Sequence, residues 1–495
     1  MGNAVTACPS GPMAIHYNPA GLLKSKEREF TFGIMYPSSV KIKSKFNLDP
    51  DFAGISMEDE KDPVDGTTGE TTDGFMRYPG MGSRSIMLVP HAALSRRKPG
   101  SKWAFGFGMY SPFISGFHHG YVNDPARFGG AQSYRQRLIY AAPSLACQLS
   151  KTLSIGFSVG LGQDAMGEKR DFRAPNEFSS MTEVLGEATE NLEIPIISEL
   201  TLPTPWFNGG LPPYDSMAGF KMDVKDSLAA SYNLGLLWEP FTWLSFGACY
   251  QSESKSRPTG RYSFKYSDQF KNFCNWFGES PTTVQIATIF ALPYYGVDEQ
   301  KGNMVLQKLI HPRRTQFGIA LKPFKILTLS CDLGWTNWSS IKEEKYIFDQ
   351  DILLFNVANF MGYPYRRDMY IIKRDLKDTW NLSIGLELLL FNRFRLRCGY
   401  EERESCTNDT NFSLIFPVQD MKIYSTGLGI KINSGWSIDF SATFIQSDTY
   451  HNDYKDGNVM NSDEFFFTLH NPYPGLDYEQ TTDITIFGFN INYVW

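Results

Sequence analysis

The chain has 495 residues, of which 47 are basic and 53 are acidic, and its formal net charge is -6. Charged residues make up only 20% of the chain, too few for a disordered or nucleic-acid-binding protein, and no basic tract is present. Mean hydropathy is -0.29, and no segment approaches the roughly 18 consecutive apolar residues that a membrane helix needs. These values exclude a bundle of transmembrane helices and leave the aromatic content, 15%, as the unusual feature.

The first 27 residues do not alternate between apolar and polar side chains, unlike the segments that follow them. Within them, Pro19 restricts its own φ and disfavours helical backbone at Asn18, while Gly21 permits a tight reversal. These residues alone predict a turn before the first strand. No signal peptide is visible at Met1, so we expect the signal of an exported chain to lie outside this numbering.

Alternation of period two dominates the rest of the chain and predicts strands. From Leu153 to Gly162, every odd position is large and apolar, and every even position is Ser or Gly. Fourteen segments of this kind follow one another, at 28–37, 82–95, 102–112, 135–149, 152–164, 225–239, 242–265, 309–323, 325–339, 376–390, 392–405, 418–433, 435–449 and 481–495.

These segments favour a membrane barrel over a soluble sandwich, whose strands average about five or six residues. The runs here are about ten residues long, as a tilted membrane strand requires. Aromatic residues lie near their ends, including Trp495. Short connections alternate with long ones at about 38–81, 165–224, 266–308, 340–375 and 450–480. We predict an all-β fold, a transmembrane antiparallel β-barrel of about 14 strands formed by residues 28–495, monomeric in the bacterial outer membrane.

Pro112 lies in the third predicted strand. Because proline cannot donate a hydrogen bond to a β-ladder, it marks a bulge, an edge or the end of a strand. The sequence leaves these alternatives open.

Two of the long connections carry apolar segments that are unusual for exposed loops. One contains residues 194–197 together with Trp206 and Phe207, and the other contains Ile286 and Phe290 after a helix-start signal. We expect the two segments to pack together and to form an access site for an apolar ligand.

Strand phase places charged side chains on the inner face of the predicted barrel. The residues turned inward in this way are Asp332, Glu387, Arg395, Arg397 and Glu401. A turn centred on Phe391 would set Glu387 directly opposite Arg395. We predict an ion-pair cluster of Asp332, Glu387, Arg395 and Arg397, whose arginines also bond carbonyl groups of residues 1–22. The alternative is a solvated lumen wall without such contacts.

No pattern points to catalysis, a cofactor or a metal. Residues 156–160 spell G-x-S-x-G, but the nucleophile of that motif needs a sharp strand-to-helix turn, and here the pentapeptide lies inside a strand. Seven cysteines and seven histidines show no ligand spacing, although Cys274 and Cys406, both in loop-like regions, could form a disulfide. We therefore expect a protein that is not an enzyme and has no cofactor and no metal.

One motif and several strand signatures together resemble the FadL/TodX family of outer-membrane transporters for long-chain fatty acids and hydrocarbons. Residues 14–22 read A-I-H-Y-N-P-A-G-L, where the family has A-I-x-Y-N-P-A-G-L. Residues 143–146, 233–237, 332–338 and 397–400 fall where the family has similar strand signatures. The chain departs from the family in the short segment before Asn18, which suggests an abbreviated N-terminus.

The resemblance implies two functional regions. Residues 1–27 would form a hatch, or plug, inside the lumen, with its gate at Asn18, Pro19, Ala20 and Gly21. An inward kink of the third strand, at Ser111, Pro112 and Gly116, would open a lateral exit through the wall.

The function that the resemblance implies is passive, diffusion-driven uptake of hydrophobic small molecules, long-chain fatty acids or hydrocarbons, with lateral release into the membrane. The expected partners are this substrate and the lipid and lipopolysaccharide of the outer membrane, and no nucleic acid. The alternative is a structural or secretion-scaffold barrel that holds a partner protein, as some relatives do. A large polar crown of loops without a continuous apolar path would favour the scaffold.

Overall fold

The computed structural model describes residues 1–47, 66–74, 76–78, 82–84, 87–119, 131–174, 176–191, 202–211, 215–360, 366–407, 412, 418–452 and 477–495. The strands from the first part of the chain are β1 (Arg28–Asn47), β2 (Thr68–Gly74), β3 (Met76–Tyr78), β4 (Gly82–Arg84), β5 (Val89–Arg96), β6 (Trp103–His119), β7 (Gln132–Ala141), β8 (Ser144–Gln148) and β9 (Leu153–Phe172). The central strands are β10 (Ala218–Phe241), β11 (Leu244–Gln251), β12 (Ser254–Ser256), β13 (Thr259–Tyr266), β14 (Glu299–Leu306), β15 (Leu309–His311), β16 (Arg314–Phe324), β17 (Leu327–Thr336), β18 (Glu343–Phe348) and β19 (Met369–Lys373). The last strands are β20 (Thr379–Leu390), β21 (Phe394–Arg403), β22 (Met421–Lys431), β23 (Trp436–Ser447), β24 (Tyr450–Asn452) and β25 (Asp477–Val494).

Short helices lie at the N-terminus and between the upper strands. They are α1 (Ala14–Tyr17), η1 (Pro19–Lys24), α3 (Asn176–Thr189), η3 (Trp206–Gly209), α4 (Asp268–Trp276), α5 (Pro281–Phe290), η4 (Trp338–Ser340) and α6 (Leu353–Phe360). Among the described helices, none has the length and apolar character needed to cross a membrane.

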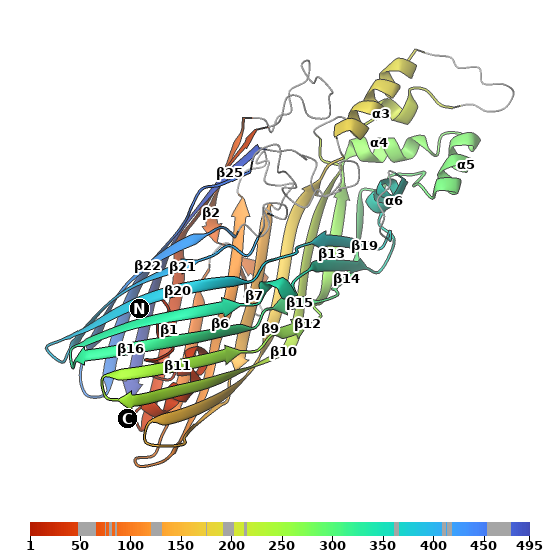
Figure 1. The fold of residues 1–495 in the computed structure, drawn as a ribbon. Helices are drawn as coiled ribbons and strands as arrows, with labels where there is room; N and C mark the ends of the chain where they lie inside the picture. Colours follow the sequence, from red (N-terminus) through yellow and green to blue (C-terminus); the bar gives the residue numbers. More distant parts are fainter. Residues whose placement is uncertain are drawn as a thin grey trace.

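Neighbouring strands pair antiparallel and close into a tilted barrel, with short turns at its lower end and helices α3 to α6 at its upper end (Figure 1). The ring closes where β1 pairs with β25, from Glu29 opposite Val494 to Asn47 opposite Asp477. In the described part of the chain the strands fill fourteen positions around the wall, so the predicted fold class is confirmed. Several positions consist of two consecutive segments. One of them is made by β2 and β5, which both pair with β1.

The strands run further upward than the alternation predicted, so parts of the predicted long loops are β-structure. Strand β1 continues to Asn47, β9 continues to Phe172 and β10 begins at Ala218. The predicted loops at 266–308, 340–375 and 450–480 likewise contain β14, β18, β19, β24 and the start of β25. The apolar alternation stops where the outer face leaves lipid, although the backbone ladder continues.

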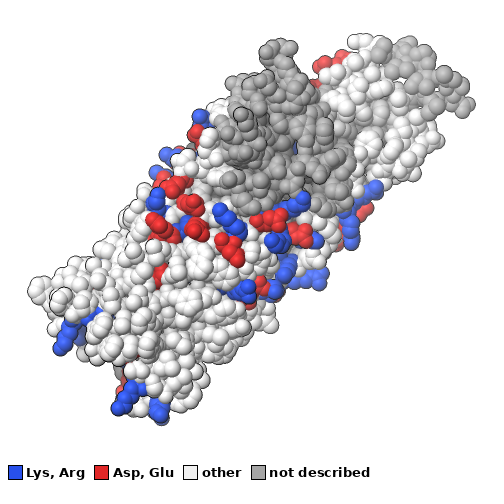
Figure 2. All heavy atoms as spheres, in the orientation of Figure 1, with Lys and Arg blue, Asp and Glu red and all other residues white. Residues whose placement is uncertain are grey.

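The outer face of the lower wall is apolar and exposed. Phe105 on β6 is 59% exposed and Phe317 on β16 is 56% exposed, which suits side chains that face lipid. Along β1 the outward positions change from Phe30 to Lys41 and Lys43. On the face seen in Figure 2, a belt of charged side chains crosses the middle of the molecule above a largely uncharged band, and further Lys and Arg side chains lie at the lower end. The belt marks the upper limit of the membrane-spanning wall.

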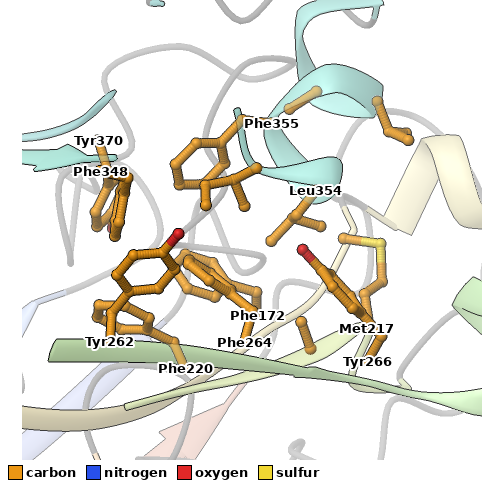
Figure 3. Close-up of a cluster of buried hydrophobic side chains, with 14 of the residues drawn as sticks. Phe172, Met217, Phe220, Tyr262, Phe264, Tyr266, Phe348, Leu354, Phe355 and Tyr370 are labelled. Atoms are coloured by element: carbon orange, nitrogen blue, oxygen red, sulfur yellow. The ribbon is translucent and has the colours of Figure 1, made fainter. Parts of the chain in front are cut away.

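Above the belt, the core lies inside the barrel and under the helices. Phe172, Phe220, Phe264 and Phe348 from the wall strands pack with Phe355 of α6, and all five are buried (Figure 3). Their ring centroids are separated by 4.8 Å for Phe220 and Phe264 and by 5.8 Å for Phe264 and Phe355. We call this aromatic cluster with its covering helices the crown.

Candidate functional site

The N-terminal segment, residues 1–27, packs against the inner face of the lower wall. Its turn is built on Asn18, a fully buried residue that caps η1 by accepting a hydrogen bond from the backbone N–H of Ala20 at 3.1 Å. The Nδ2 group of Asn18 donates to the carbonyl oxygens of Thr6 at 2.8 Å and of Leu236 at 3.0 Å. One amide thus joins two parts of the segment to strand β10.

Glycines on the inner face make room for this turn. A Cβ at Gly235 on β10 would lie 2.2 Å from Asn18 Oδ1, and a Cβ at Gly156 on β9 would lie 2.2 Å from the backbone of Pro19 and Ala20. Any side chain at these two wall positions would displace the turn. The inward positions of 153–162 are therefore occupied by small residues because the N-terminal segment packs on them.

Polar side chains of the wall hold the backbone of the segment. The buried carboxylate of Asp332 on β17 accepts hydrogen bonds from the N–H groups of Val5 at 3.0 Å and Thr6 at 2.8 Å, and from Gln316 at 2.8 Å. Wall side chains also donate to carbonyl oxygens of the segment, from Ser330 to Ala4 (2.7 Å), Gln316 to Asn3 (3.2 Å), Gln251 to His16 (2.8 Å) and Asn233 to Ile15 (3.2 Å).

The predicted ion-pair cluster is assembled differently from the expectation. Arg397 forms ion pairs with Glu387 and with Asp439 on β23, each at 2.7 Å. Asp332 lies elsewhere, because it faces Ser383 on β20, whereas Glu387 faces Thr328. Asp439 was not predicted, although it occupies an inward position of an alternating strand.

The predicted register of the β20–β21 hairpin was wrong. Glu387 faces Arg397, and Arg395 faces Leu389 and is exposed. The turn is centred on Asn392, because Phe391 and Asn392 both adopt positive φ (52° and 54°) and the hairpin closes between Leu390 and Phe394. Two consecutive left-handed residues are usually signalled by Asn-Gly or Asp-Gly, and that signal is missing here.

The predicted arginine contacts to carbonyl groups of residues 1–22 are wrong, because in the described structure neither Arg395 nor Arg397 bonds one of these groups. Neutral side chains and Asp332 bind that backbone instead. One arginine does bond the segment just beyond this range, since Arg97 donates to the carbonyl oxygen of Leu23.

A second charged layer, which the sequence analysis missed, crosses the inside of the upper wall. Its ion pairs join Arg137 to Asp164 (2.9 Å), Arg374 to Glu344 (2.8 Å), Arg135 to Glu344 and Arg170 to Glu168, and His311 lies 3.4 Å from Asp164. All of these residues are buried. In β7 the only sequence signal was the alternate spacing of Arg135 and Arg137, which carries no apolar periodicity.

Glu344 shows how strongly this layer is coupled. It lies on β18, above the membrane-spanning wall, where the outward neighbours Glu343 and Lys345 are charged. Burial opposes ionisation of the Glu344 carboxyl, but the positive charges of Arg135 and Arg374 outweigh it and lower its pKa to about 2. The carboxylate therefore stays charged inside the protein.

The wall is interrupted where β2 and β5 are separate segments. Strand β5 pairs with residues 28–35 of β1 and β2 pairs with residues 42–45, so among the described strands residues 36–41 of β1 have no ladder partner on this side. Residues 110–116 of β6 likewise have no described ladder partner on the side of β2 and β5. We call this interruption the seam.

The residues predicted to form the lateral exit lie at the seam. Strand β6 does not end at Pro112 but continues to His119, and its register with β7 shifts between Tyr110 and Phe113. Ser111 and Pro112 therefore form a bulge, and Gly116 lies further along the same unpaired edge. Of the alternatives left open for Pro112, the bulge is the one found.

The two apolar loop segments both join the crown, by different contacts. Phe207 packs on Phe273 and Trp276 of α4, with ring centroids 5.4 Å and 4.8 Å apart, and Trp206 lies beside it, half-buried. On α5, Ile286 is half-buried, whereas Phe290 is 50% exposed and meets Phe360 of α6 at 5.2 Å. Residues 194–197 lie outside the described residues.

Two further expectations concern metals and cysteines. Within the described ranges, no group of three or more His, Cys, Asp or Glu side chains is gathered as a metal ion would require. Cys274 and Cys406 are both free thiols, each buried in a different apolar cluster, so they do not form the disulfide that the loop positions allowed.

A closed barrel with an apolar outer band, a girdle of charge and an N-terminal segment packed in its lower lumen defines an outer-membrane β-barrel protein. Over residues 1–495 the sequence matches the family described as outer membrane protein transport protein (OMPP1/FadL/TodX), and the chain belongs to this family. None of the curated proteins matches the sequence.

Solved structures share the fold at low sequence identity. A FadL homologue from Pseudomonas aeruginosa superposes with a TM-score of 0.67 at 16% identity, covering 99% of this chain and 95% of that one. The P. putida toluene transporter TodX gives 0.59 at 13% identity, covering 98% and 95%. The Ralstonia pickettii toluene transporter TbuX gives 0.56 at 14% identity, covering 99% and 97%.

Proposed function

We propose that this protein is a passive channel for hydrophobic small molecules, which bind at the crown, enter the upper barrel and leave sideways into the membrane. The observation that carries the proposal is the contrast between the two ends of the path. The N-terminal segment packs on the inner face of the lower wall, whereas among the described strands the wall above it is interrupted at the seam. Downward release would require moving the segment, and sideways release would not.

The crown supplies an apolar surface for the ligand. Ile289 is 75% exposed, and Phe290 and Phe360 are 50% and 48% exposed on neighbouring helices. Exposed apolar residues clustered in this way mark binding surfaces in soluble regions. The aromatic core beneath is occupied by its own side chains, so we place the first binding step on the surface of α5 and α6.

The charged layer bears on the substrate class. Arg170 Nη2 and Arg374 Nη1 are buried and have no hydrogen-bond partner among the described residues. Guanidinium groups pair well with carboxylates. This favours a long-chain fatty acid over a plain hydrocarbon, while the toluene transporters named above support the broader class of hydrophobic substrates.

In this proposal the N-terminal segment is the hatch, and the turn at Asn18, Pro19, Ala20 and Gly21 is its gate. The hatch is supported by the number of wall groups that hold its backbone. A concentration gradient drives the flow, so no energy source is required.

The test is uptake of a radiolabelled long-chain fatty acid by cells that lack their own channel for it. Phe290→Asp places a charge in the exposed apolar patch and is expected to lower uptake about tenfold, the factor set by about 1.4 kcal/mol of lost binding. Trp206→Ala is expected to have a smaller effect of the same sign. Gln285→Asp is the matched control, because it adds the same charge at an exposed position of α5 and leaves the patch intact.

Normal uptake by Phe290→Asp would show that the exposed apolar surface of the crown does not take part in uptake. No uptake by folded wild-type protein would overturn the transport proposal and leave the scaffold alternative, in which the crown binds a partner protein.

A further inference from the structure

The seam is not empty, because the β3–β4 hairpin lies in it. Residues Met76–Tyr78 pair antiparallel with Gly82–Arg84 as a separate two-stranded sheet. Met76 and Met87, 6% and 7% exposed, form a small cluster with Val89, and Ile114 of β6 packs against it. The chain thus leaves the wall between β2 and β5 and packs against the unpaired edge of β6.

On one side, the hairpin touches the outer face of the wall. Arg77 exchanges two hydrogen bonds with the side chain of Gln136 on β7, donating its backbone N–H at 3.0 Å and accepting at its carbonyl oxygen at 2.9 Å. Its guanidinium pairs with Asp223 on β10 at 2.5 Å.

Gln136 and Asp223 both point outward, since the residues that alternate with them lie inside. Arg135 and Arg137, on either side of Gln136, belong to the charged layer of the upper lumen. Met222 and Val224, on either side of Asp223, belong to the buried crown core.

We call the part of the chain between Gly74 and Met87, which includes the hairpin, the excursion. On its other side, the excursion touches the inner face of β1. A Cβ at Gly74 would lie 3.5 Å from the side chains of both Met87 and Val40. Val40 is buried and points inward, whereas its neighbour Lys41 is exposed on the outer face. The excursion is therefore wedged between the inside of β1 and the outside of β6 and β7, where a continuous strand would otherwise close the wall.

The contacts that hold the hairpin are weaker than those inside the barrel. The Arg77 and Asp223 side chains are 20% and 38% exposed, whereas those of Arg374 and Glu344 are 3% and 1% exposed. Exposed ion pairs are screened by water and salt and contribute little individually. Because β3 and β4 pair with no wall strand among the described residues, movement of the hairpin would break no ladder of the wall.

We propose that the β3–β4 hairpin is the gate of the seam and that Arg77 is its latch, with Asp223 and Gln136 as the groups that receive it. A hydrophobic molecule leaving through the seam displaces the Met76 and Met87 side chains. The contacts of Arg77 determine how often the hairpin moves aside and lets this happen. This proposal rests on the proposed lateral release.

The test measures access to the seam and transport separately. Ile114→Cys places a thiol beneath Met76 and Met87, and its reaction with a membrane-impermeant maleimide is followed at that residue by mass spectrometry. Arg77→Glu in this background is expected to raise the labelling rate about tenfold, because an attractive pair becomes a repulsive one. Arg77→Glu combined with Asp223→Arg restores the pair and is expected to return labelling to within about twofold of wild type. Arg96→Glu, at an exposed position of β5 away from the hairpin, is the matched control.

Fatty-acid uptake by the same variants is expected to rise and fall with the labelling rate. Unchanged labelling in Arg77→Glu would show that Arg77 does not hold the hairpin in place. Raised labelling with unchanged uptake would show that the hairpin is not the gate of the seam. If wild-type protein took up no substrate, the proposed function would fail, and so would the gate. The labelling result would then still decide whether Arg77 holds the hairpin.

Discussion

The lower and upper halves of the barrel carry opposite chemistry on their two faces. Below the charged belt, the outer face is apolar, and the inner face presents glycines and polar side chains, Asp332 among them, that pack on or bind the N-terminal backbone. Above it, the outer face is charged and the inside holds aromatic rings and buried ion pairs. The surroundings explain the difference. Lipid supplies the apolar environment below, whereas the upper half stands in water and builds an internal core as a soluble domain does.

The largest effect is expected from removing the main anchor of the lower half. In Asp332→Ala, the N–H groups of Val5 and Thr6 lose a charged acceptor, worth about 1.5–3 kcal/mol each. The N-terminal segment should detach while the barrel stays closed. Hydrogen exchange of residues 1–22 should then accelerate about a hundredfold or more.

Arg395→Ala is the matched control for that experiment, because Arg395 is exposed and Glu387 pairs with Arg397 instead. It should leave the exchange of residues 1–22 unchanged, in contrast to what the sequence alone led us to expect. Slow exchange of the segment in Asp332→Ala would show that the lower half does not depend on this carboxylate.

The upper half should respond to acid. The pKa of Glu344 is lowered from 4.5 to about 2, so the unfolded chain binds a proton there more readily than the folded one. The resulting stability is complete above pH 4.5 and is lost as the pH falls toward 2, by about 3 kcal/mol in total. Urea titrations followed by tryptophan fluorescence across this range should show the midpoint falling with pH. Glu344→Gln should flatten that dependence, and a wild-type midpoint that does not change would contradict the assignment.

A smaller effect is expected where the wall and the N-terminal segment touch most closely. Gly235→Ala puts a methyl group against Asn18 Oδ1, and overpacking of this kind costs about 1–3 kcal/mol. The turn should shift, and leak conductance in planar bilayers should rise. Gly219→Ala on the same strand is the control, because its new methyl would lie 3.4 Å from the nearest atom, the Asp171 Oδ1. Equal conductance in the two variants would argue against occlusion by the turn.

The lower half was predictable from sequence because lipid imposes a strict period on each strand. The fourteen strands follow from that period, whereas proline chemistry limited Pro112 to a bulge, an edge or a strand end without choosing among them. The upper parts of the strands were predicted as loops, because water on the outer face removes the apolar alternation that identifies a strand. The β20–β21 turn was misplaced by one residue, since Phe391 and Asn392 reach positive φ without glycine. The seam was missed in the second strand, which was predicted as continuous from 82 to 95, whereas β5 begins at Val89.

In the proposed route, a ligand enters through the crown and leaves through the seam, above the N-terminal segment. The most direct measurement uses a fatty acid with a photoreactive diazirine, crosslinked to the protein in membranes and mapped by mass spectrometry. Crosslinks are expected around Phe290 on the crown and around Ile114 at the seam, and none in the lumen below Asn18. Crosslinks below Asn18 with none at the seam would show that the ligand leaves through the end of the barrel, and would contradict lateral release.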